Sequence, residues 1–240
     1  MNTDTYQFAV SGMKVNVVRK RIKNLHLGVY PPHGRVRVAA PLGLTRDAVR
    51  LAVIDKLTWI KRQRAKFEAQ LRQSEREFVS GETHYFLGRR YRLRVIEHDA
   101  PPAVLLHGKN GIYLYVRPAS STEKREQVFL DWYRAQLKEI VLGLIDKWQR
   151  IVGVQVESWG VRKMKTKWGS CNTSSDRLLL NLELAKKPVQ CIEYVIVHEL
   201  MHLLERKHND RFIALMDKHL PNWRQYRDEL NSSVLGPNCW

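Results

Sequence analysis

Four residues have types and a spacing that suit metal binding and acid–base chemistry. His198, Glu199 and His202 form an H-E-x-x-H run, and His208 follows six residues after His202. Two residues four positions apart on a helix lie on the same face, with about 5–6 Å between their Cβ atoms. This spacing allows two imidazole nitrogens to bind one zinc ion, and the glutamate between them can act as a general base toward a zinc-activated water. The run therefore predicts a metal-dependent hydrolase.

His208 can join this site only if the helix ends soon after His202. On a continuous helix, six residues would carry His208 about 9 Å further along the axis and onto a different face. The polar residues 205–207 interrupt the apolar pattern, and Asn209 or Asp210 can cap a new helix. We therefore expect His208 at a corner between two helices, as the third ligand of one zinc ion. The alternative third ligands are two downstream carboxylates, Asp217 and Glu229.

Three neutral histidine ligands would leave a fourth position on the zinc ion open. Catalytic zinc sites keep such a position, whereas structural sites are closed by a fourth protein ligand. In that case zinc would lower the pKa of a water, and Glu199 would take its proton and pass it to the leaving group. The same histidine spacing occurs in proteins that have a glycine three residues after the second histidine, where the helix ends. In this chain that position is Glu205. The other interpretation of the run is an amphipathic helix with surface histidines.

A second group of residues lies upstream of the histidines, at the end of a predicted strand: Lys167, Trp168, Gly169, Ser170 and Cys171. Glycine inside a strand often marks the close approach of a ligand or of another backbone. The alternative is a turn with a tryptophan in the core. Cys171 could be a nucleophile, but it could equally be a small buried residue.

Composition restricts the class of protein. At 240 residues, with 44% hydrophobic and 27% charged residues, the chain can form a sizeable core and is expected to be globular. It has no stretch of 18 consecutive apolar residues and no visible secretory signal, so we expect no membrane span. Its three cysteines form no C-x-x-C pair, which argues against a zinc ribbon and a disulfide framework and predicts a cytoplasmic protein.

The charge balance indicates anionic partners. The chain has 41 basic and 24 acidic residues, a net charge of +17. Such an excess favours nucleic acid, nucleotides or acidic surfaces as partners, although it can also serve solubility alone. The basic residues cluster in four segments of the sequence, at residues 19–23, 61–64, 89–94 and 162–167.

Hydrophobic periodicity predicts an α+β chain in two parts. Residues 1–118 are expected to form a β-rich region with one long helix, and residues 119–240 a domain that contains the H-E-x-x-H helix. Thr45 is expected to cap the first helix, and Ser121 or Thr122 the long helix that follows. We detect no internal repeat.

The expected helices lie at residues 46–72, 122–150, 209–219 and 221–231, and a further helix is expected from Pro188 through the H-E-x-x-H run. The expected strands lie at residues 14–40, 85–116 and 155–182.

These motifs together resemble a known family. The run from Lys167 to Cys171, followed by Asn181, Pro188, residues 197–200 and His208, is similar to the YgjP-like metallopeptidase domain, which is related to SprT-like zinc proteins. The similarity extends over nearly the whole chain. Further matching segments are residues 40–41, 59–60, 81–82, 87–88 and 221–223.

The resemblance implies a minigluzincin-like, and so zincin-like, catalytic half in which a short sheet packs on the H-E-x-x-H helix. It implies one zinc ion at His198, His202 and His208, with Glu199 as the general base. It also makes residues 168–171 a wall of the substrate cleft. The candidate substrate-binding residues are therefore Lys165, Lys167, Trp168, Gly169, Ser170 and Cys171.

Three functions remain open at this point. The first is a zinc-dependent metallopeptidase, with residues 177–182 as an edge strand that could pair with an extended peptide. The second, also implied by the resemblance, is a metal-dependent pyrophosphatase acting on a nucleoside triphosphate such as UTP, in which Lys165 and Lys167 would bind phosphate. The third is a nucleic-acid-associated module with a metal site, because the chain is strongly basic.

Overall fold

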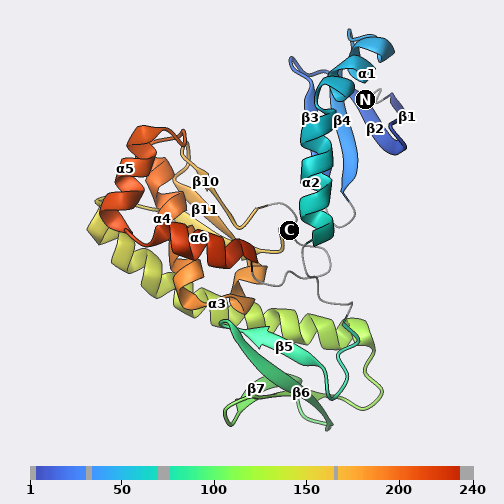
Figure 1. The fold of residues 1–240 in the computed structure, drawn as a ribbon. Coiled ribbons are helices and arrows are strands. Elements are labelled where there is room, and N and C mark those ends of the chain that lie inside the picture. Colours follow the sequence, from blue (N-terminus) through green and yellow to red (C-terminus); the bar gives the residue numbers. More distant parts are fainter. Residues whose placement is uncertain (1–3, 31–33, 70–75, 165–166, 233–240) are drawn as a thin grey trace. The chain divides into compact units, whose positions relative to one another are not determined.

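The computed structural model describes residues 4–30, 34–69, 76–164 and 167–232, and Figure 1 shows the fold. The chain divides into two compact units, residues 1–73 with 234–240 and residues 74–233. Both combine helices with small mixed sheets, which confirms the predicted α+β class. In the described ranges, no helix is long and apolar enough to cross a membrane.

The first unit is a four-stranded sheet followed by two helices. The strand order is β1-β2-β4-β3, with antiparallel pairs at both sides and a parallel pair, β2 with β4, in the centre. Alternate strand residues such as Val15 and Val36 are buried together with Val53 and Ile60 of the helices. The elements are β1 (Thr5–Val10), β2 (Met13–Lys20), β3 (His26–Tyr30), β4 (Arg35–Pro41), α1 (Arg46–Asp55) and α2 (Leu57–Ala69).

The helix expected at residues 46–72 is therefore two helices. Thr45 caps the first of them, since its side chain accepts a hydrogen bond from the amide of Ala48. The break is at Lys56, whose φ of −94° and ψ of 11° lie outside the α-helical range.

The second unit begins with another four-stranded sheet, in the order β5-β6-β8-β7. Its elements are β5 (Thr83–Phe86), β6 (Arg89–Glu97), β7 (Ala103–His107) and β8 (Gly111–Val116), followed by α3 (Thr122–Val152). Ser121 caps α3 by accepting a hydrogen bond from the amide of Lys124. One face of the sheet packs its alternate residues against α3, so that Leu93 and Ile112 share a core with Phe129.

The expected domain boundary at residue 118 falls inside this unit. The segment there joins a sheet to the helix that packs on it, and the buried residues of both belong to one core.

The two four-stranded sheets have the same topology, although we detected no repeat in the sequence. In both, two antiparallel hairpins are joined by a central parallel pair, and a helix packs on one face. In both, the residue that caps the helix follows the last buried residue of the fourth strand by five positions, Ala40 to Thr45 and Val116 to Ser121. The side chains differ so much that only the backbone topology shows the repeat.

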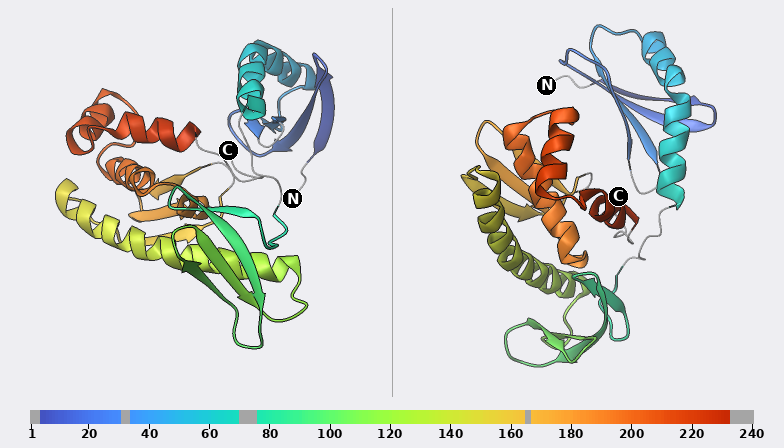
Figure 2. Two further views of the ribbon diagram at one scale, coloured as in Figure 1. Left: turned by 60° about the horizontal axis from the view of Figure 1, so that its bottom comes forward. Right: turned by 60° about the vertical axis from the view of Figure 1, so that its left-hand side comes forward.

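The rest of the second unit is a three-stranded sheet covered by helices. Its elements are β9 (Ser158–Arg162), β10 (Gly169–Asn172), β11 (Arg177–Asn181), the 3-10 turn η1 (Leu182–Lys186), α4 (Val189–Leu204), α5 (Asp210–His219) and α6 (Trp223–Ser232). The helix α4 contacts α3, α5, α6 and β10 and is buried along most of its length, and α3 lies between α4 and the β5–β8 sheet (Figure 2).

The strand order of this small sheet is β10-β11-β9. The strand β11, which corresponds to the edge strand expected at residues 177–182, is therefore the central one, and that expectation is wrong. It is held on one side by an antiparallel pair and on the other by a parallel pair. The strand nearest the H-E-x-x-H helix is β10.

Candidate active site

Three histidine side chains come together at the end of α4. His198 and His202 lie on this helix, which ends at Leu204, and His208 lies in the turn before α5. One potential ligand atom of each histidine lies within 4.8 Å of the others, and Nε2 of His198 and Nε2 of His208 are 3.1 Å apart. The structure thus brings together the three residues that the sequence predicted as metal ligands.

The corner between the two helices forms as predicted. Glu205 ends α4 in an extended conformation (φ −146°, ψ 114°), and Asn209 caps α5 by accepting a hydrogen bond from the amide of Phe212 at 3.0 Å. Residues 205–209 all lie in the described part of the chain, and none has a positive φ. The chain therefore turns back without the left-handed residue that a glycine would provide.

The chemistry of the three histidines fits a metal ion. Burial, together with the neighbouring His202 and His208, lowers the pKa of His198 to about 3, and burial also lowers the pKa of His202. The neutral imidazole that a metal requires is therefore the stable form. Nδ1 of His202 lies 3.1 Å from the carbonyl oxygen of Glu205, a contact that leaves Nε2 for a metal. Three imidazole nitrogens match the ligand preference of zinc.

The two carboxylates considered as alternative ligands are engaged elsewhere. Asp217 accepts a hydrogen bond from Nε1 of Trp223 at 2.7 Å and pairs with Arg224, and Glu229 accepts from Gln190 at 3.2 Å. Among the residues that the structure describes, the histidine group includes neither of them.

Glu199 lies on the same helix, 7% exposed, and faces β10. A Cβ atom added to Gly169 would come within 2.7 Å of Oε1 of Glu199 and 2.9 Å of Cγ1 of Val195. The glycine noted in the sequence thus lies where the helix with its buried carboxylate comes close to the strand, and a side chain at this position would displace the carboxylate. The close approach that Gly169 marks is therefore to the helix α4 of the same chain.

The charge state of Glu199 depends on opposing effects. Burial raises its pKa to about 7, while the positive charge of Lys167 and a hydrogen bond from the backbone N–H of Cys171 lower it. A carboxylate with a pKa near neutrality can both accept and release a proton at physiological pH, as a general base must.

The remaining predicted site residues lie on or before β10. Gly169 is buried, Ser170 and Cys171 are half-buried, and Trp168 precedes the strand with its ring 5.3 Å from Nζ of the buried Lys187. Lys167 is exposed, and its charge acts on both Glu199 and His202. Lys165 lies outside the described residues.

Cys171 is not suited to be a nucleophile. Burial, followed by the charges of Glu199 and Asp176, raises the pKa of its thiol to about 11. The reactive form of cysteine is the thiolate, which is scarce at neutral pH under these conditions. Cys171 was interpreted either as a nucleophile or as a small buried residue. The structure favours the second, since Cys171 is a half-buried residue of β10.

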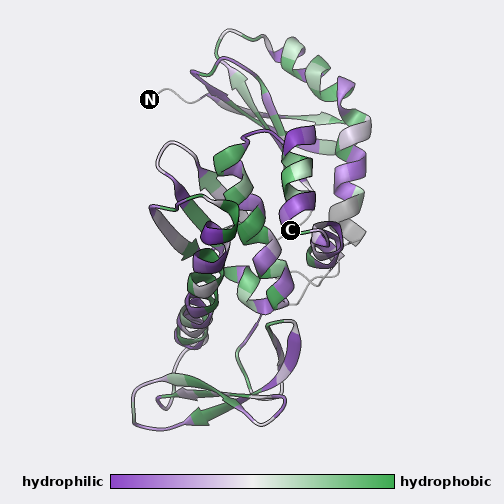
Figure 3. Cartoon of the chain, turned by 90° about the vertical axis from the view of Figure 1, so that its left-hand side faces the viewer, coloured by the Kyte–Doolittle hydropathy of each residue, from purple (hydrophilic) through white to green (hydrophobic). Residues whose placement is uncertain are grey.

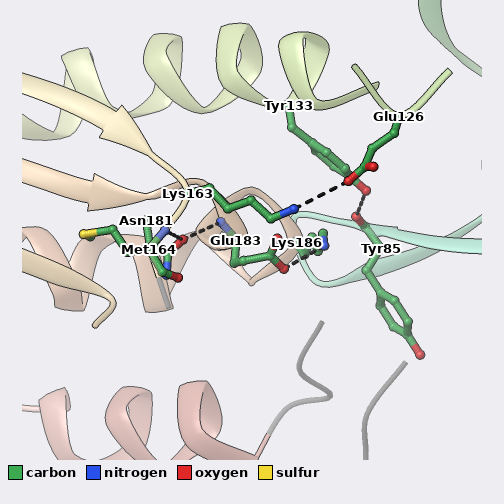
Figure 4. A network of polar contacts seen from close by, with 8 residues as sticks. All are labelled: Tyr85, Glu126, Tyr133, Lys163, Met164, Asn181, Glu183 and Lys186. Carbon is green, nitrogen blue, oxygen red and sulfur yellow. Dashed lines mark hydrogen bonds and ion pairs between the residues drawn. The ribbon is translucent and has the colours of Figure 1, made fainter. Parts of the chain in front are cut away.

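Asn181 holds the segment before β10 and is a residue to which sequence reasoning assigned no role. Its Oδ1 accepts hydrogen bonds from the amides of Met164 and Glu183, both at 3.2 Å, and its Nδ2 donates to the carbonyl oxygen of Met164 at 3.0 Å (Figure 4). Its Nδ2 also donates to the carbonyl oxygen of Lys167 at 2.8 Å. Its backbone amide donates to the carbonyl oxygen of Trp168. The side chain is 3% exposed, so one amide ties residues 164 and 167 to the end of β11. The only signal in the sequence was its place in the motif run that resembles the family, and that resemblance did not indicate these contacts.

A mixed sheet packed on a helix with the H-E-x-x-H run, and a third histidine beyond it, define the class of metallopeptidase-like α+β proteins. The family model for the YgjP-like metallopeptidase domain matches residues 23–233. The chain therefore belongs to this family, and the family implies a divalent metal, typically zinc.

The other comparisons add little. A search of the curated proteins finds none that matches the chain. Among solved structures, the chain is similar to the crystal structure of the metallopeptidase zymogen of Pyrococcus abyssi abylysin, at 20% sequence identity and a TM-score of 0.36. That similarity covers 38% of this chain and 90% of the other, and it is too low to support an argument about the site.

Proposed function

We propose that the chain is a zinc-dependent metallopeptidase in which His198, His202 and His208 hold one zinc ion and Glu199 is the general base. The observation that carries this proposal is the convergence of three imidazoles, two of them with lowered pKa values, next to a buried carboxylate with a pKa near 7. When bound, zinc would supply Lewis acidity, which polarises a carbonyl group and makes water more acidic.

The protein residues provide the proton transfers. Glu199 takes a proton from the attacking water at its carboxylate and gives it to the leaving amine when the peptide bond breaks. The N–H of Cys171 holds this carboxylate in place from the side of β10. Gly169 leaves room for it, since any side chain would collide with Oε1.

The strand β10 is the part of the protein that we expect to align a peptide. Among the described strands it pairs only with β11, so no described strand occupies its other edge. An extended peptide can add to such an edge through main-chain hydrogen bonds. The described cysteines, Cys171 and Cys191, are free, which fits the cytoplasmic location that we also propose.

The test is cleavage of unstructured proteins by the zinc-loaded chain. Cleavage should stop with a chelator and return when zinc is added, and Glu199→Gln should lower the rate by roughly two orders of magnitude or more. Glu139→Gln, which removes an exposed carboxylate from α3, should leave the rate unchanged. Cleavage at the wild-type rate by Glu199→Gln would rule out the assigned base.

The second candidate is a nucleoside triphosphate pyrophosphatase, and one observation favours it. The positive charge of Lys167 acts on both Glu199 and His202, so a cation lies where a phosphate could bind next to the metal. In this case UTP should release pyrophosphate, and Lys167→Ala should slow the reaction at least about tenfold. Lys138→Ala, which removes an exposed lysine from α3, is the control. Unchanged turnover by Lys167→Ala would contradict this second assignment.

A further inference from the structure

The sheet formed by β5–β8 has one face that the α3 core does not use. Along β6 the residues alternate, so that Tyr91 and Leu93 are buried on the α3 side while Arg90, Arg92 and Arg94 are exposed on the other. Figure 3 shows that this sheet, at the bottom of the view, contains both hydrophilic and hydrophobic residues. We call the side that carries the three arginines the outward face.

The strands beside β6 add rings to the outward face. In the register of the sheet, Arg94 lies opposite Tyr113 of β8, with its guanidinium carbon 5.7 Å from the centre of the tyrosine ring. On the other side, the ring of Tyr113 stacks on that of His107 of β7, with centroids 4.6 Å apart and an angle of 11°. A guanidinium, a phenol and an imidazole thus form a row across three strands.

The outward face is also free of acidic side chains. The outward positions of the four strands, two on β5, four on β6, three on β7 and three on β8, contain neither Asp nor Glu. In the described part of the chain, Arg92 and Arg94 form no ion pair. Between the strands lies an open hollow of about 760 Å³, whose lining includes Arg92, Arg94, His107, Lys109 and Tyr113 and no carboxylate.

The first unit repeats this pattern on its own sheet. The buried pairs Val15–Val36 and Leu93–Ile112 occupy equivalent positions in the two parallel strand pairs. By this equivalence Lys14 corresponds to Arg92. The outward positions of β1–β4 are likewise basic and contain no acidic residue; among them are Lys14, Arg35 and Arg37. Among the described strand residues, Lys14 and Arg92 are the one pair of outward charges at equivalent positions, since Arg94 corresponds to Asn16 and Arg37 to Tyr113. What the two described sheets share is a basic outward face without acidic residues.

The combination of charge and rings selects the ligand. Arginines and lysines bind phosphates, with a strong dependence on salt. Rings and guanidinium planes on a sheet stack on unpaired bases, which a duplex keeps hidden between its base pairs. A face that offered charge alone would suit any polyanion.

We propose that the outward face of the β5–β8 sheet binds single-stranded nucleic acid. Phosphates lie on Arg92, Arg94 and Lys109, and a base stacks on the exposed ring of His107 at the end of the row, where Tyr113 is stacked on the other face of that ring. The histidines of the metal site are on α4 and in the turn before α5, so this binding does not require the proposed peptidase activity.

The test is the binding of the full chain to fluorescently labelled 12-residue oligouridylate and oligodeoxythymidylate, followed by anisotropy at several salt concentrations. The double variant Arg92→Ala/Arg94→Ala should bind at least about tenfold more weakly, and the slope of log affinity against log salt should become shallower by about 1.4, or 0.7 for each lost phosphate contact. Tyr113→Leu should weaken binding about fivefold or more through lost stacking. Glu199→Gln should bind like the wild type.

The matched control is Lys124→Ala/Lys138→Ala, which removes two exposed charges from α3. Thermal unfolding of each variant checks that it is folded. Several results would overturn the proposal: no binding by the wild type, equal weakening by the control, or tighter binding of a duplex of the same sequence. An unchanged affinity of Tyr113→Leu, with heparin competing as well as the oligonucleotide, would show a general polyanion surface instead. Loss of binding only in Lys14→Ala/Arg37→Ala would assign the function to the other sheet.

Discussion

At the scale of single residues, the site depends on how closely a strand and a helix approach each other. Gly169 has no side chain, so the carboxylate of Glu199 can lie against β10 and receive the N–H of Cys171. The sequence indicated that the glycine marks a close approach, but it could not identify the partner. The partner lies 30 positions further along the chain, and only the packing of α4 on β10 brings the two together.

Gly169→Ala should therefore damage the site more than the fold. The new Cβ would come within 2.7 Å of Oε1 of Glu199, and we expect the carboxylate to shift and kcat to fall at least tenfold. The free energy of unfolding should fall by about 1–3 kcal/mol. Gly143→Ala, which has open space around it on α3, should stabilise the protein slightly and leave kcat unchanged. Equal kcat values in the two variants would contradict this account.

His84 makes a second prediction at this scale, concerning stability. It is 5% exposed, its ring lies 4.6 Å from that of Phe129, and Oε2 of Glu82 is 3.0 Å away. Burial is the main cause that lowers its pKa from 6.5 to about 4. Between these two values the unfolded chain binds a proton and the folded chain does not, so stability falls as the pH is lowered from about 6.5 to about 4.

The full loss from His84 would be about 3 kcal/mol at most. Urea unfolding at pH 7 and pH 5 measures it. In His84→Asn, which does not titrate in this range, the difference between the two pH values should be smaller than in the wild type. The same difference in both proteins would show that His84 does not cause the pH dependence.

At the scale of elements, helix ends were predictable and strand neighbours were not. The break after His202 and the cap at Asn209 are signalled locally, by a polar stretch and by a side chain that accepts hydrogen bonds. The position of β11 between β9 and β10 depends on pairing between distant segments, and the edge position expected for it was wrong. The role of Asn181 was invisible for the same reason, since its partners lie 14 and 17 positions upstream.

The cap at Asn209 should affect metal binding as well as stability. Asn209→Ala removes the hydrogen bond to Phe212 and should cost about 1 kcal/mol. Because His208 is the preceding residue, zinc affinity should also fall, by roughly tenfold. Ser121→Ala removes the equivalent cap from α3 and should lower stability without changing zinc affinity. If both variants bind zinc like the wild type, the cap does not position His208.

Asn181 should matter for activity beyond its contribution to stability. Asn181→Asp keeps the size of the side chain and its acceptor oxygen but loses both donor contacts, to the carbonyl oxygens of Met164 and Lys167. We expect a loss of about 1–3 kcal/mol in stability and, at a temperature where the variant is folded, a lower kcat with an unchanged zinc content. A kcat equal to that of the wild type would limit Asn181 to a structural role.

At the scale of the whole molecule, composition predicted the class but not the arrangement. The α+β class, the family and the metal motif could be predicted, because they depend on periodicity and on a few residue types. The division after residue 73 and the repeated sheet topology could not, because they depend on which segments share a core. The sequence located the basic residues in four clusters but could not show which surface each cluster occupies, whereas in the structure both four-stranded sheets carry a basic, acid-free outward face.

The central claim is that a helix and the turn after it form a three-histidine zinc site, and a competition titration with zinc tests it most directly. The account predicts one zinc ion per chain and an affinity that falls roughly 100-fold or more in His208→Ala. Asp217→Asn, which alters a carboxylate outside the histidine group, should bind zinc like the wild type. Wild-type affinity in His208→Ala, or weakened binding only in Asp217→Asn, would contradict the claim.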